Sequence, residues 1–167
     1  MSEQADTGPA VVHGLLRFFA AWLAGTVVAY AVGSISQSIC VMRELSSAGA
    51  ELTTDISLQV ILHDLRHLAF GGKYVWYGAN LAIGFLIAFP CAMLIARLLK
   101  MPVELVGSVA GAVAITTMIM IVNFNSPSTI FAGTRGWDGM LAQVIAGAIG
   151  GAVFSGCLRT RRSASVG

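Results

Sequence analysis

The sequence predicts an all-α integral membrane fold: a four-helix bundle with one short amphipathic helix on its outer face. Of the 167 residues, 56% are hydrophobic and only 11% are charged, whereas soluble domains carry about 25% charged residues. Four apolar stretches are each long enough to cross about 30 Å of hydrocarbon. Basic residues gather near the ends of these stretches on one side, a pattern typical of cytoplasmic segments.

The first span is expected over about residues 14–42, after a disordered tail formed by the polar residues 1–12. Small residues recur at every fourth position in this span: Ala21, Gly25, Ala29 and Gly33. On a helix they form one stripe that a neighbouring backbone can approach closely.

A cleaved signal peptide is the alternative for this N-terminal stretch. Arg17 would be its basic region and Ala29-Tyr30-Ala31 its cleavage site. The apolar stretch continues beyond that site, which favours an uncleaved span.

An outer loop is expected over residues 43–74, with an amphipathic helix of about 15 residues that begins near Asp55. Its apolar residues recur at helical spacing: Leu58, Ile61, Leu62, Leu65 and Leu68. We expect this helix to lie on the membrane surface or to cover the mouth of the bundle. Tyr74, Trp76 and Tyr77 then form an aromatic belt at the start of the second span.

The second and third spans are expected over residues 75–99 and 103–122, joined by a tight basic turn. Pro90 predicts a kink in the second span because proline removes a backbone donor. Pro102 is suited to the first turn of the third span. Gly107 and Gly111 give the third span a stripe of small residues.

The fourth span is expected over residues 137–158, after an outer loop at 123–136. It carries interleaved small stripes, one of which contains Gly147 and Gly151. We therefore expect it to contact two neighbours and to be central. The membrane domain covers residues 13–158, and residues 159–167 form a basic cytoplasmic tail.

The basic residues also predict the orientation. One side carries the cations nearest to the span ends: Arg17, Arg97, Lys100, Arg159, Arg161 and Arg162. The opposite loops mix basic residues with acidic ones. The positive-inside rule places both termini in the cytoplasm, and we expect a plasma or inner membrane location.

Two uncharged polar residues, Asn80 and Gln143, lie inside predicted spans. They have two interpretations: interhelical hydrogen bonds, worth about 1 kcal/mol each, or the lining of a path for a solute. The first is the more frequent role of such residues.

His63 and His67 share one face of the amphipathic helix, and this spacing can hold a transition metal. A third ligand is missing from the local sequence, so solvated histidines are the simpler interpretation. No cofactor is implied elsewhere. Cys40, Cys91 and Cys157 are far apart and form no Cys-x-x-Cys pair.

Several absences limit the function. No predicted span contains a charged residue away from its ends, although ion-coupled transporters usually keep one. No span contains a histidine to ligate haem, and no phosphate-binding loop or nucleophile elbow occurs. The net charge of +2 does not favour nucleic acid as a partner.

The sequence thus favours a non-enzymatic membrane protein, an accessory or scaffold subunit of a membrane complex or a homo-oligomer. Its expected partners are the lipid bilayer and other membrane subunits or further copies of itself. A small transporter or channel for a neutral or weakly polar solute is the first alternative. A metal- or quinone-linked redox subunit that uses the outer histidines is the second.

Overall fold

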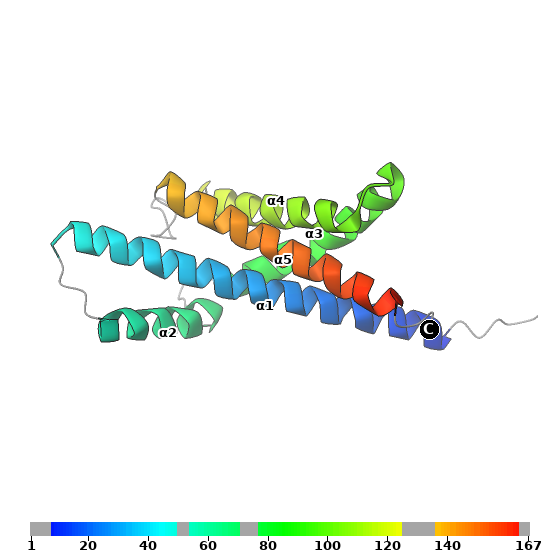
Figure 1. Ribbon diagram of the computed structural model, residues 1–167, viewed down its shortest axis with the longest axis horizontal. Coiled ribbons are helices and arrows are strands. Elements are labelled where there is room, and N and C mark those ends of the chain that lie inside the picture. Colours follow the sequence, from blue (N-terminus) through cyan, green and yellow to red (C-terminus); the bar gives the residue numbers. More distant parts are fainter. Residues whose placement is uncertain (1–7, 50–53, 71–76, 125–135, 164–167) are drawn as a thin grey trace, which may run out of the picture.

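The structure, a computed structural model, describes residues 8–49, 54–70, 77–124 and 136–163. These residues form five helices and no strand (Figure 1), namely α1 (Gly8–Ser47), α2 (Thr54–Phe70), α3 (Tyr77–Leu99), α4 (Val103–Phe124) and α5 (Trp137–Ser163). All except α2 are long and apolar enough to span a membrane. The predicted fold class, an all-α membrane bundle with one shorter helix, is therefore confirmed.

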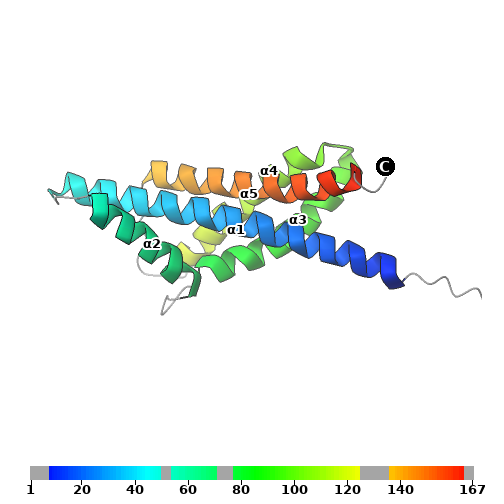
Figure 2. The same cartoon turned by 60° about the horizontal axis from the view of Figure 1, so that its bottom comes forward.

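The four long helices run alternately up and down. The beginning of α1 and the end of α5 lie at the same end of the bundle in two views (Figures 1 and 2). The α3–α4 connection is also at this end, which we call the inner end. The opposite, outer end carries the end of α4, the beginning of α5 and the helix α2.

Helix α1 is longer than the sequence predicts at both ends. It begins at Gly8, within the expected tail, and ends at Ser47, within the expected outer loop. Its 40 residues span about 60 Å, roughly twice the hydrocarbon thickness of a bilayer. The helix is therefore about twice as long as a perpendicular crossing requires.

Helix α2 runs alongside the outer part of α1 (Figure 2). Tyr30 donates a 2.6 Å hydrogen bond to the carbonyl oxygen of Leu65, and Ser38 donates a 2.7 Å bond to the Asp64 carboxylate. Leu58 and Leu62 are each 57% exposed. Part of the apolar stripe of α2 therefore faces away from the bundle, while Asp64 faces α1.

Helix α5 lies between α1 and α4, and glycines bring the backbones together. A Cβ atom on Gly25 of α1 would lie 2.7 Å from the carbonyl oxygen of Gly150. On the other side of α5, a Cβ atom on Gly111 would collide with the carbonyl group of Gly147. Side chains larger than hydrogen do not fit at such crossings.

The core of the bundle contains a cluster of aromatic side chains from α3 and α5. Phe89 of α3 stacks on Phe154 of α5 with ring centroids 4.1 Å apart, and Phe85 lies against Phe89 at 4.6 Å. All three side chains are fully buried. The Trp22 indole of α1 donates to the carbonyl oxygen of Ala82 at 3.1 Å, which ties α1 to α3.

The α3–α4 connection is a tight turn with a non-glycine residue in the left-handed region. Lys100 has φ 52°, and the N–H of Met101 donates to the carbonyl oxygen of Ala96 at 3.0 Å. This is the Schellman pattern that ends many helices, usually with glycine at that position. Pro102 directly precedes α4, and its carbonyl oxygen accepts the N–H of Val106 at 3.3 Å.

The fourth span and its tail form one helix. Helix α5 continues to Ser163, so the expected tail at 159–167 begins in helical conformation. Helix α3 runs from Tyr77 to Leu99 with Pro90 inside it.

Candidate functional site

A buried hydrogen-bonded unit joins three of the spanning helices at Gln143. The Tyr77 hydroxyl of α3 donates to Gln143 Oε1 at 2.7 Å. Gln143 Nε2 in turn donates to the carbonyl oxygen of Gly33 in α1 at 2.9 Å. Gln143 and Tyr77 are each only 1% exposed. The side-chain amide thus uses its oxygen and its nitrogen within the protein.

Gly33 makes this unit possible. A Cβ atom at Gly33 would lie 2.8 Å from Gln143 Oε1 and would also collide with the Tyr77 hydroxyl. The Tyr77 ring also lies 5.9 Å from the Tyr30 ring, between centroids. The last member of the small stripe on α1 therefore leaves room for a polar contact rather than for a neighbouring backbone.

The other members of the predicted small stripes are also buried. Ala21 and Ala29 of α1 are 3% and 0% exposed. Gly107 and Gly111 of α4 lie against Gly151 and Gly147 of α5. These stripe residues therefore pack helices against each other within the chain.

Asn80 lies in a different place from Gln143. It is half-buried at one end of an apolar groove of about 650 Å³ between α3 and α4, which Gln143 does not line. Small residues, Gly84, Ala88 and Ala110 among them, line the groove. Within the described part of the chain the Asn80 amide makes no hydrogen bond.

The two outer histidines are on α2. The His63 imidazole is 67% exposed, and its Nδ1 lies 3.7 Å from the Asp64 carboxylate. The side chain of His67 lies outside the described residues. Among the side chains that the structure describes, no group of three or more histidine, cysteine or acidic residues is placed to hold a metal ion.

The sequence does not identify Tyr77, Ser38 and Asp64 as interacting residues. Its pattern predicts Tyr77 in an aromatic belt, because tyrosines are common where helices enter a membrane. A weak signal was present, since a tyrosine hydroxyl buried in a span needs an acceptor and Gln143 is one of few available. For Ser38 and Asp64 no sequence signal identifies the partner.

The comparisons with known proteins give no further information: no protein-family model, curated protein or solved structure matches this chain.

Proposed function

We propose that this protein is a non-enzymatic membrane scaffold that assembles with a second copy of itself through the groove between α3 and α4. The observation that carries the proposal is the position of Asn80. Its carboxamide lines an apolar groove and has no hydrogen-bond partner among the described residues, and a polar group left unpaired against an apolar surface is costly.

A second copy would satisfy this group. Most homo-oligomers have two-fold symmetry, and an axis along the membrane normal places both Asn80 side chains at the same depth. A carboxamide carries both donors and an acceptor, so two of them can pair with each other. Polar side chains of this kind join helices in membranes.

The shape of the groove supports the same arrangement. Its lining extends from Asn80 and Val122 near the outer end to Ile95 and Val106 near the inner end. It therefore runs along most of both helices. Nothing within 4 Å would meet a Cβ atom on Gly84, which leaves this part of the lining open to a neighbouring helix.

The mass of the assembly in a mild detergent or in nanodiscs, measured by native mass spectrometry, tests the proposal. We expect a dimer for the wild-type protein. Gly84→Leu fills open space in the groove, so we expect a folded monomer. Gly156→Leu is the matched control, because it also enters open space but lies on α5 outside the groove. It should leave the dimer intact.

Asn80→Leu tests the polar contact separately. Interhelical hydrogen bonds in membranes contribute about 0.6 kcal/mol on average and up to about 1.7, so the loss of a mutual pair should weaken the dimer about tenfold. A monomeric wild-type protein, a complex with only foreign subunits, or a dimer that is insensitive to Gly84→Leu would each overturn the proposal.

A further inference from the structure

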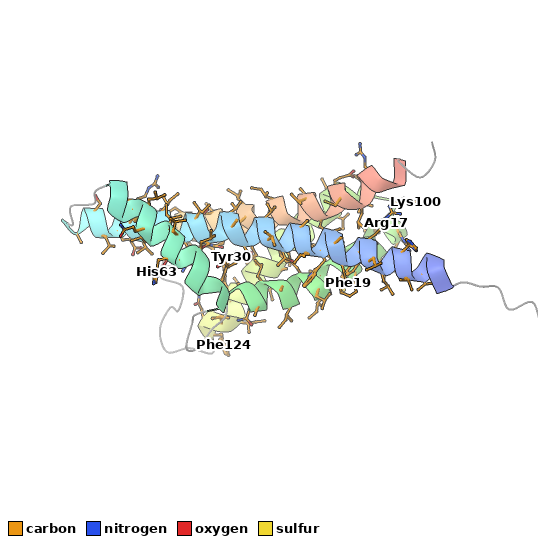
Figure 3. All side chains as sticks on the ribbon, turned by 90° about the horizontal axis from the view of Figure 1, so that it is seen from below. Arg17, Phe19, Tyr30, His63, Lys100 and Phe124 are labelled. Carbon is orange, nitrogen blue, oxygen red and sulfur yellow. The ribbon has the colours of Figure 1, made fainter. Side chains whose placement is uncertain are left out.

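The inner end of the bundle contains a second cavity, of about 460 Å³, where four helices meet. The charged residues that line it are Arg17 of α1, Arg97 of α3, Glu104 of α4 and Arg159 of α5. Its walls include apolar side chains such as Phe18 and Met93. Figure 3 labels Arg17 and Lys100 at this end of the molecule, and His63 towards the other.

The charges in this cavity are only partly balanced. Arg159 Nη1 lies 2.6 Å from Glu104 Oε1, so this arginine and the only acidic residue of the lining form an ion pair. Arg17 and Arg97 form no ion pair or hydrogen bond with any residue that the structure describes. Arg17 is nevertheless half-buried. Two guanidinium groups are therefore available to an anion from outside the chain.

We propose that this cavity binds the headgroup phosphate of an anionic phospholipid. Guanidinium groups bind phosphate oxygens through two parallel hydrogen bonds. Basic pockets between spanning helices are suited to anionic headgroups. Arg17 and Arg97 contact the phosphate, and the Arg159–Glu104 pair holds α5 against α4 at the edge of the cavity.

The apolar walls favour a lipid over a free phosphate ion. The cavity lies at the ends of the spanning helices, where the headgroups of a bilayer are located. Phe18 and Met93 give the walls a surface that an acyl chain can cover and that inorganic phosphate cannot use. The site is independent of the α3–α4 groove, because the two linings have no residue in common.

Lipid binding to the full-length protein in neutral detergent, measured by native mass spectrometry, tests this proposal. Phosphatidylglycerol and phosphatidylcholine with the same acyl chains are the probes. We expect phosphatidylglycerol to bind at least tenfold more tightly. Each of Arg17→Gln and Arg97→Gln should weaken its binding about fivefold, as expected for one basic residue near a membrane surface.

Arg43→Gln is the matched control, since Arg43 is an exposed arginine on the same helix as Arg17 but near its other end. It should bind both lipids as the wild-type protein does, and thermal melting shows whether each variant is folded. A tenfold excess of inorganic phosphate should not displace the lipid. Equal binding of the two lipids, unchanged binding in folded Arg17→Gln and Arg97→Gln variants, or full displacement by inorganic phosphate would each overturn the proposal.

Discussion

Gln143 is the residue at which three helices are joined by side-chain hydrogen bonds. In hydrocarbon no water replaces a lost hydrogen bond, so its partners depend on it. The sequence identifies Gln143 as notable because it is polar within an apolar run. It does not identify Tyr77 and Gly33 as its partners, because they lie 66 and 110 residues away along the chain.

Gln143→Leu should lower the free energy of unfolding by about 1–3 kcal/mol, because it leaves the Tyr77 hydroxyl and the Gly33 carbonyl group unpaired. Reversible unfolding in mixed micelles measures this change. Tyr77→Phe removes only one of the two bonds and should cost about 1 kcal/mol. A Gln143→Leu protein as stable as the wild type would show that these bonds do not stabilise the bundle.

Lys100 is a second residue at which a substitution should change the free energy of unfolding, because its backbone is in the left-handed region. Its φ of 52° is disfavoured for a side chain with a Cβ atom by about 1–2 kcal/mol. Lys100→Gly should therefore raise the free energy of unfolding by about 0.5–1 kcal/mol, after the greater entropy of unfolded glycine is subtracted. Lys100→Val should lower it, because β-branched residues tolerate this region least. Thermal melting of the two variants should shift in opposite directions.

Among the elements, α5 has the central position between α1 and α4 (Figure 1). The apolar runs predict the spanning helices well, because hydrocarbon requires continuous helices of a minimum length. They do not predict where α1 ends. Ser34, Gln37 and Ser38 make the sequence polar after Gly33, but α2 packs there and Ser38 bonds to Asp64. These contacts lie within the expected range 14–42. The additional helical residues, 43–47, are followed by Gly49, which has φ 92° and whose N–H donates to the carbonyl oxygen of Ser46 at 3.0 Å. The apolar runs do not indicate this local end.

Gly111→Ala tests the crossing of α4 and α5. The new methyl group would collide with the backbone of Gly147, and overpacking of this kind costs about 1–3 kcal/mol. Gly156→Ala is the control, because its methyl group meets nothing within 4 Å and it lies outside the α3–α4 groove. It should leave stability unchanged or raise it by up to about 1 kcal/mol. If both variants melt at the same temperature, close backbone packing does not hold α4 to α5.

At the scale of the whole molecule, the four helices that are long and apolar enough to span a membrane bring the beginning of α1 and the end of α5 to the same end of the bundle (Figure 1). The structure also gathers Arg17, Arg97 and Arg159 around one cavity at that end. From the sequence, these arginines predict only the orientation. The cavity requires the ends of four helices to meet, and their relative positions depend on packing that the sequence alone does not specify.

The positive-inside rule predicts that this basic end faces the cytoplasm. A reporter that is active only in the cytoplasm should therefore work when it is fused before Met1 and when it is fused after Gly167. The same reporter inserted after Ser47, at the outer end of α1, should be inactive. Activity of the Ser47 fusion together with inactive terminal fusions would reverse the orientation.

The unbroken course of α1 has a mechanical consequence. One rigid rod connects the buried contacts at Gly25 and Gly33 with the tip at Ser47, about 20 Å beyond Gly33. A small tilt of its embedded half is therefore amplified into a larger sideways displacement of the tip, as at the far arm of a lever. Any change in the angle between α1 and α5 at these contacts would therefore also displace the tip at Ser47.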